Sequence, residues 1–157
     1  MSAAMDLILW RHADAHEASA DQPDAERMLT AKGERQAQRM AQWLHRHLPD
    51  STRVLVSPTL RTLQTADALD LKYKVMAELA PEASVEALLH AARWPDGRGP
   101  VLVVGHQPTL GLAAAYLLAG TTTPLSVRKG ALWWLRRRTR GDESDVVLQA
   151  VVAPDQV

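Results

Sequence analysis

Three short apolar runs constrain the fold of this chain more than any other feature. Residues 7–10, 54–56 and 101–104 are apolar throughout and rich in branched side chains, and each run is too short for a helix. Such runs are typical of strands that are buried on both faces of a sheet. Stretches with helical periodicity lie between them, and this alternation favours a mainly parallel sheet covered by helices on both faces. We therefore expect an α/β fold, arranged as a three-layer α/β/α sandwich.

Four stretches have apolar residues at the spacing of a helix. Thr30 is a favourable N-cap for a first helix that runs to about Leu48, and Pro49 ends it. The other helices are expected at about residues 60–69, 85–92 and 108–120. With the three strands, they complete a repeated alternation of strand and helix.

The C-terminal part of the chain has a different pattern. Residues 131–135 and 146–152 are expected to be strands, and the polar segment 136–145 between them, which contains Gly141, is expected to form the turn of an antiparallel hairpin. The longest irregular segment is expected over residues 13–29, which makes it a candidate for a loop that faces the substrate.

Composition limits the classes of function. A chain of 157 residues with 46% apolar content and no visible repeat or linker is expected to form one domain over residues 1–157. The 18 basic and 18 acidic residues cancel, so we expect neither a nucleic-acid partner nor a membrane partner. The absence of cysteine excludes disulfides and cysteine nucleophiles and fits a reducing compartment. We expect a cytoplasmic monomer.

Cationic side chains follow the three apolar runs where each strand is expected to end. Arg11 and His12 follow the first run. Ser57 follows the second, with Arg61 one helical turn later, and His106 follows the third. Ligands bind beyond the carboxyl ends of parallel strands, so the two arginines and two histidines are expected to converge. Guanidinium groups match phosphate oxygens and imidazole can attack phosphorus, which indicates phosphoryl transfer.

The segments around these residues carry motifs. Leu-Trp-Arg-His-Ala stands at residues 9–13, Ser-Pro-Thr-Leu-Arg-Thr-Leu-Gln-Thr-Ala at 57–66, and Gly-His-Gln-Pro at 105–108. In this order they resemble the signatures of the histidine phosphatase superfamily, which includes phosphoglycerate mutases. The short chain most resembles the SixA-type phosphohistidine phosphatases, over about residues 5–118. The resemblance implies a phosphoglycerate mutase-like fold and a phosphatase that uses no metal or other cofactor.

The resemblance also implies roles for individual residues. It makes His12 the nucleophile, which carries the phosphoryl group as a phosphohistidine intermediate. It gives Arg11, Arg61 and His106 the task of holding the phosphoryl oxygens and offsetting their charge. Positioning and electrostatic stabilisation supply most of the catalysis in such transfers, so cationic side chains can act without a metal ion.

Two features depart from the family pattern. Ala13 replaces the signature glycine, and we expect this small residue to be accommodated unless the backbone needs a positive φ. Glu78 is the candidate general acid, with Glu82 and Asp14 as fallbacks; a solvated loop carboxylate is the alternative for each. An imidazole leaving group needs a general acid less than an alkoxide does. The weak assignment therefore favours phosphohistidine as the substrate.

Three hypotheses remain for the function. The first is phosphohistidine on a protein, for example a histidine phosphotransfer domain, because a short chain has little room for insertions that enclose a metabolite. The second is a small phosphomonoester metabolite, and the third is a catalytically silent domain that binds phosphate or protein. The acidic loop over residues 13–29 would orient a partner, repel free anions or simply be solvated.

Two further groups of residues have simpler interpretations. The arginines within 136–140 could contact nucleic acid, but acidic residues follow them within 142–145, which favours a solvated turn that protects a sheet edge. A zinc site formed by His12, His16 and His106 is conceivable, but the spacing of a ligand pair is missing.

Overall fold

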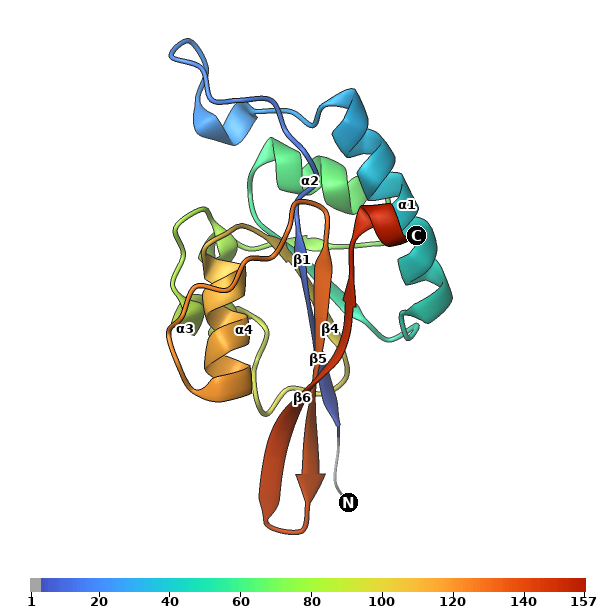
Figure 1. Ribbon diagram of the computed structural model, residues 1–157, viewed down its shortest axis with the longest axis vertical. Coiled ribbons are helices and arrows are strands. Elements are labelled where there is room, and N and C mark those ends of the chain that lie inside the picture. Colours follow the sequence, from blue (N-terminus) through green and yellow to red (C-terminus); the bar gives the residue numbers. More distant parts are fainter. Residues whose placement is uncertain (1–3) are drawn as a thin grey trace.

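A six-stranded sheet with the strand order β3-β2-β4-β1-β5-β6 lies at the centre of the computed structural model, which describes residues 4–157 (Figure 1). The strands are β1 (Met5–Arg11), β2 (Arg53–Val56), β3 (Lys74–Val75), β4 (Val101–Gly105), β5 (Leu132–Arg140) and β6 (Glu143–Val152). Strands β1 to β4 pair in parallel, whereas β5 and β6 add an antiparallel hairpin beside β1. The predicted α/β fold with a mainly parallel sheet and a C-terminal hairpin is confirmed.

Helices cover both faces of the sheet. The four α-helices are α1 (Ala31–His47), α2 (Leu60–Asp67), α3 (Val85–Ala91) and α4 (Thr109–Ala119), and the 3-10 helices are η1 (Asp24–Glu26), η2 (Ala77–Leu79) and η3 (Pro154–Gln156). Helices α1 and α2 lie on one face, and α3 and α4 on the other (Figure 1). Thr30 is the N-cap of α1, as predicted, and accepts a hydrogen bond from the Gly33 amide. Among the helices of residues 4–157, none has the length and apolar character needed to cross a bilayer.

The continuous apolar run of β1 is explained by burial on both sides. Leu7 and Leu9 pack in the cluster that includes α3 and α4, whereas Ile8 and Trp10 pack in the cluster that includes α1 and α2. All four side chains are fully buried. Because successive side chains of a strand point to opposite faces, a strand between two helical layers must be apolar at every position.

The turn of the hairpin contains Gly141, as predicted, but it is much shorter than the predicted range 136–145. Only Gly141 and Asp142 lie outside the strands of the hairpin, and the rest of the polar segment continues β5 and β6. Arg138 of β5 faces Asp145 of β6 and binds its carboxylate at 2.9 Å. Charge pairs across the strands therefore replace apolar contacts in this part of the ladder.

Candidate active site

Two arginines and two histidines meet at the carboxyl ends of β1, β2 and β4. Arg11 ends β1 and pairs with Gly105 of β4, so His12 and His106 leave two neighbouring strands at the same level. Arg61 lies in the first turn of α2, directly after β2. All four side chains line one pocket of about 300 Å³. The structure thus brings together the residues that the sequence predicted to converge.

The His12 ring is oriented by its own neighbour in the chain. The side chain is 6% exposed, and its Nδ1 lies 2.8 Å from the carbonyl oxygen of Ala13. A carbonyl can only accept, so Nδ1 carries the proton and donates it to this bond. In the neutral ring Nε2 therefore keeps its lone pair, which is the state that a nucleophile requires.

His106 is fixed in the opposite tautomer by two partners. Its Nε2 lies 2.7 Å from the hydroxyl oxygen of Ser57, and its Nδ1 lies 3.4 Å from Nη2 of Arg61. The guanidinium can only donate, so Nδ1 accepts and the proton of the neutral ring resides on Nε2, which donates to Ser57. No role for Ser57 was predicted from the sequence, although its place at the end of β2, inside a motif, was a usable signal.

Burial and nearby cations keep both histidines neutral. Desolvation is the largest of the effects that together bring the pKa of His12 down to about 4; the hydrogen bond to Ala13 raises this pKa, and the charges of Arg61 and Arg11 lower it. Desolvation, followed by the charges of His12 and Arg61, lowers the pKa of His106 to about 3. At neutral pH the pocket therefore contains an unprotonated nucleophile, and a bound dianion would favour protonation of His106.

Main-chain carbonyls hold both arginines in place, but not every N–H of their guanidinium groups has an acceptor. Arg61 is 3% exposed and donates to the Asp24 carbonyl at 2.9 Å and to the Asp24 carboxylate at 3.0 Å. Arg11 donates to the carbonyl of Val127 at 3.0 Å. Within residues 4–157 the buried Nε of each arginine has no acceptor. Both side chains also line the pocket, where their guanidinium groups would donate to the oxygens of a bound oxyanion.

A threonine hydroxyl connects the nucleophile to one of the arginines. The amide of Ala13 donates to Oγ1 of Thr65 at 3.1 Å, and the same hydroxyl donates to the carbonyl of Arg61 at 2.8 Å. Ala13 is fully buried and is not among the residues with a positive φ, so alanine fits where the family has glycine. The structure thus removes the doubt that this departure raised.

The predicted general acid lies outside the pocket. Glu78 follows β3 in η2, where its Oε2 lies 3.3 Å from Nδ1 of His90 and lines a different hollow. Glu82 does line the pocket of His12, and so does Glu17, which was not predicted because no motif in the sequence marks it. Of the candidate carboxylates, Glu82 is therefore the one placed near His12.

Asp14, the other fallback, is engaged elsewhere. Its carboxylate accepts from the Thr30 hydroxyl at 2.7 Å and lies 3.3 Å from Nζ of Lys129. The hydrogen bond from Thr30 is the largest cause that holds the pKa of Asp14 below its usual value. A carboxyl group with a lowered pKa is ionised at neutral pH and has no proton to donate.

The irregular segment before α1 reaches the site through η1. Asp24 binds Arg61 and also accepts from Nε of Arg27 at 2.9 Å. Burial raises the pKa of Asp24, but the hydrogen bonds from both arginines lower it more, so it stays below the usual value. Within residues 4–157 no group of three or more histidine and acidic side chains is placed to hold a metal ion.

Comparisons with known proteins agree with this geometry. The model of the histidine phosphatase superfamily (branch 1) matches residues 7–84. Phosphohistidine phosphatase SixA of Escherichia coli (strain K12) is 37% identical over 130 residues, which are 77% of this chain and 79% of that protein. The SixA homolog of Haemophilus influenzae is 31% identical over 78% of this chain and 82% of its own length. A solved structure of the protein histidine phosphatase SixA complexed with tungstate has a TM-score of 0.78 at 28% identity, covering 96% of this chain and 97% of that one.

Proposed function

The chain belongs to the histidine phosphatase superfamily and is a SixA-like phosphatase, and we propose that it removes the phosphoryl group from phosphohistidine on a protein through an intermediate on His12. The observation that carries the proposal is the composition of the pocket. A ring nitrogen with a free lone pair lines the same pocket as two guanidinium groups. This combination suits a phosphoryl group better than any uncharged ligand.

The first step is attack on phosphorus. Arg11 and Arg61 bind the phosphoryl oxygens, His106 joins them once the bound dianion has favoured its protonation, and Nε2 of His12 forms a bond to phosphorus. The bond between phosphorus and the substrate imidazole breaks, and its electron pair returns to the imidazole nitrogen. When the other nitrogen of that ring carries a proton, the ring leaves as a neutral molecule. No general acid is then needed, which fits the position of Glu78 away from the pocket.

The second step returns the enzyme to its starting state. Water attacks phosphorus, the bond to Nε2 of His12 breaks, and the electron pair returns to the ring. One proton of the water stays on the released phosphate as its hydroxyl, and the other passes to solvent. Glu82 lines the pocket and is the carboxylate we assign to orienting this water.

No metal ion is needed in this mechanism. The two guanidinium groups offset the charge of the phosphoryl dianion, and their bonds to the Val127 and Asp24 carbonyls hold them in place before substrate binds. The SixA relative binds tungstate, a tetrahedral oxyanion like phosphate. Turnover should therefore be unchanged after dialysis against a metal chelator.

The size of the pocket favours a protein substrate. A volume of about 300 Å³ accommodates one phosphorylated ring and leaves the rest of the partner outside. The partner we propose is a phosphorylated signalling protein such as a histidine phosphotransfer domain, and we place the reaction in the cytoplasm with a monomeric enzyme. A small phosphomonoester is the alternative substrate, and its alkoxide leaving group would require a general acid.

One comparison of substrates tests the proposal. Turnover of a histidine phosphotransfer domain carrying labelled phosphohistidine is measured beside turnover of a set of sugar phosphates. We expect rapid loss of label from the protein and little release of phosphate from the sugars. Acid quench should trap label on the wild-type enzyme but not on His12→Ala. Robust activity on the sugars alone, or undiminished turnover by His12→Ala, would refute the proposal.

A further inference from the structure

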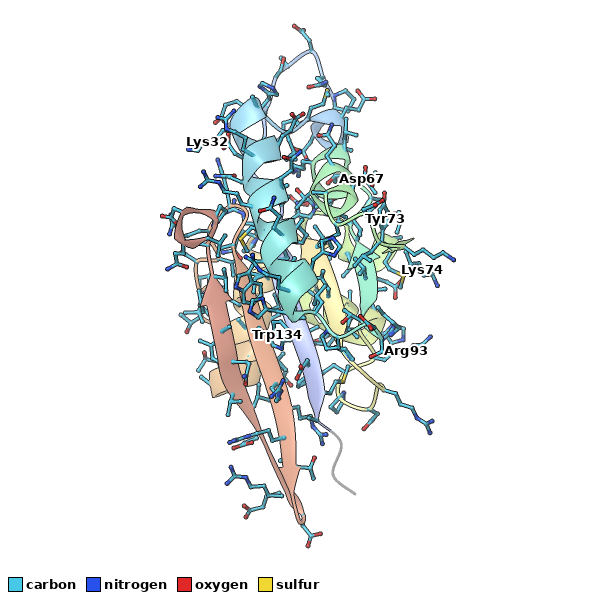
Figure 2. The ribbon with its side chains drawn as sticks, turned by 90° about the vertical axis from the view of Figure 1, so that its right-hand side faces the viewer. Lys32, Asp67, Tyr73, Lys74, Arg93 and Trp134 are labelled. Atoms are coloured by element: carbon cyan, nitrogen blue, oxygen red, sulfur yellow. The ribbon has the colours of Figure 1, made fainter. Side chains whose placement is uncertain are left out.

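A second concentration of cations lies at the edge of the sheet. Figure 2 shows Tyr73, Lys74 and Arg93 on the side of the molecule opposite β5 and β6. They line a cleft of about 590 Å³ between the β2–β3 edge and α3. The cleft shares no lining residue with the pocket of His12. It is therefore separate from the catalytic site.

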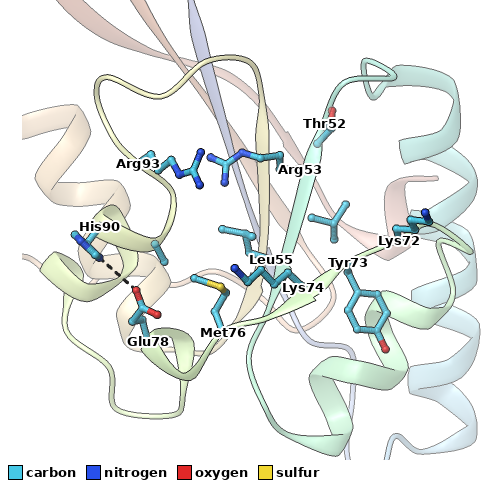
Figure 3. A pocket seen from close by; sticks show the side chains of 12 residues that line it. Thr52, Arg53, Leu55, Lys72, Tyr73, Lys74, Met76, Glu78, His90 and Arg93 are labelled. Carbon is cyan, nitrogen blue, oxygen red and sulfur yellow. Dashed lines mark hydrogen bonds and ion pairs between the residues drawn. The ribbon is translucent and has the colours of Figure 1, made fainter.

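The cleft combines a cationic wall with an apolar floor. Its cations are Arg53, Lys72, Lys74 and Arg93, and its apolar residues include Val54, Leu55, Met76 and Ala91 (Figure 3). The cleft contains one acidic side chain, Glu78, whose carboxylate lies 3.3 Å from Nδ1 of His90. The formal charge of the whole chain is zero, so this excess of positive charge is local.

Two arginines in the cleft face one another without a counter-ion. Figure 3 shows the guanidinium groups of Arg53 and Arg93 pointing toward each other. Arg53 donates to the Ala92 carbonyl at 3.1 Å, and in the described part of the chain neither arginine forms an ion pair. Burial, followed by the charge of Arg93, lowers the pKa of Arg53. An anion between the two groups would replace this repulsion with attraction.

The backbone at Arg93 is also unusual. Its φ is +58°, in the left-handed region that glycine adopts at low cost and other residues rarely enter. Arg93 directly follows Ala92, the C-cap of α3, where glycine is the common choice. The fold thus keeps a long cationic side chain at a position where its backbone is strained.

We propose that the cleft binds a small organic anion. Its carboxylate or phosphate group lies between Arg53 and Arg93, where two guanidinium groups can each donate to its oxygens. Its apolar part lies against Leu55 and Met76. The proposal depends on the cleft alone and would stand if the catalytic assignment were revised.

The test uses the methyl group of Met76 as a reporter. The full chain, labelled with ¹³C at the methionine methyls, is titrated with phenylphosphonate, an oxyanion with an apolar ring that the enzyme cannot hydrolyse. Methylphosphonate serves as the probe without an apolar body. We expect the Met76 signal to shift and saturate with a dissociation constant of the order of 1 mM for phenylphosphonate. The dissociation constant of methylphosphonate should be at least about tenfold higher, because it has no apolar ring.

Two variants separate binding from folding. Arg53→Gln combined with Arg93→Gln should weaken phenylphosphonate at Met76 by about tenfold or more. Arg93→Gly should also weaken phenylphosphonate binding, but by less. Its melting temperature should equal or exceed that of wild type, because glycine relieves the strained φ. Arg39→Gln, an exposed arginine on α1, is the matched control and should bind like wild type. A Met76 signal that does not saturate, or that saturates equally in the double variant, overturns the proposal.

Discussion

The catalytic pocket and the edge cleft place similar cations in different surroundings. In the pocket, Arg61 is 3% exposed and both arginines are held by main-chain carbonyls. In the cleft, Arg93 is exposed and Arg53 is half-buried. A charge in a dry, fixed surrounding acts through a low dielectric and is little screened, whereas an exposed charge is screened by water and salt. The number of cations alone therefore does not distinguish a reaction site from a binding site.

Removal of the nucleophile should give the largest effect. In His12→Ala the attacking nitrogen is lost, and kcat should fall by at least about 10⁴-fold on a phosphohistidine protein. The cleft double variant should stay within about twofold of wild type, because no cleft residue lines the pocket of His12. Steady-state release of labelled phosphate measures both, and a large loss in the cleft variant would remove the distinction between the sites.

Exchange of one arginine in each site should give the next largest effect. Arg61→Gln removes a buried donor to the transferring group, and kcat/KM should fall by about 10²–10³-fold. Arg61→Lys should recover little of this loss, since an ammonium group cannot replace the guanidinium fork. The matched change in the cleft, Arg93→Gln, should leave kcat/KM unchanged.

The buried histidines should make stability depend on pH. Their pKa values in the fold, about 4 for His12 and about 3 for His106, lie below the value of about 6.5 for an unfolded chain. As the pH falls below 6.5 the unfolded chain takes up protons and the folded chain does not, so stability is lost. Between pH 6.5 and 5 each histidine should account for a loss of about 2 kcal/mol. Urea unfolding should show a correspondingly smaller loss for His12→Asn, and an equal loss would contradict the assignment.

Loss of the Ser57 hydroxyl should have a smaller effect. Ser57→Ala removes the partner that holds the proton of His106 on Nε2. A hydrogen bond of this kind contributes about 0.5–1.5 kcal/mol, so kcat should fall about three- to tenfold. Ser57→Thr, which keeps a hydroxyl, should recover part of the loss. A simple structural role would instead lower the melting temperature without changing the pH profile of kcat.

Ionic strength should give the smallest of the expected differences between the two sites. Raising the ionic strength should weaken phenylphosphonate at the cleft several-fold, since its cations are largely exposed. Inhibition of turnover by tungstate should change less, because Arg61, which is 3% exposed, is shielded from solvent. Equal salt dependence would indicate that burial does not set the difference between the sites.

The sequence predicted those parts of the site that strands position. His12 and His106 follow buried apolar runs, and the ends of parallel strands meet at one edge of the sheet, so their proximity follows from the strand pattern. Asp24 and Glu17 could not be found this way. They lie in an irregular segment whose path depends on contacts such as the bond from Arg61 to Asp24, and no periodicity encodes these contacts.

Glu78 and the hairpin show two further limits. Glu78 lies after the two-residue strand β3, and the short η2 turns it toward His90 rather than His12, a choice that no spacing in the sequence reveals. The strands of the hairpin extend through a polar segment because charge pairs such as Arg138–Asp145 replace the apolar alternation by which strands are recognised. Both errors fall where single side-chain contacts, and not the pattern of burial, decide the structure.

The hydroxyl of Thr65 has a mechanical consequence. One oxygen atom joins the main chain after the nucleophile to the main chain that carries Arg61. A small slide of α2 would therefore carry the loop of His12 along with it. These two hydrogen bonds therefore help to keep the distance between the His12 ring and the Arg61 guanidinium constant when α2 moves.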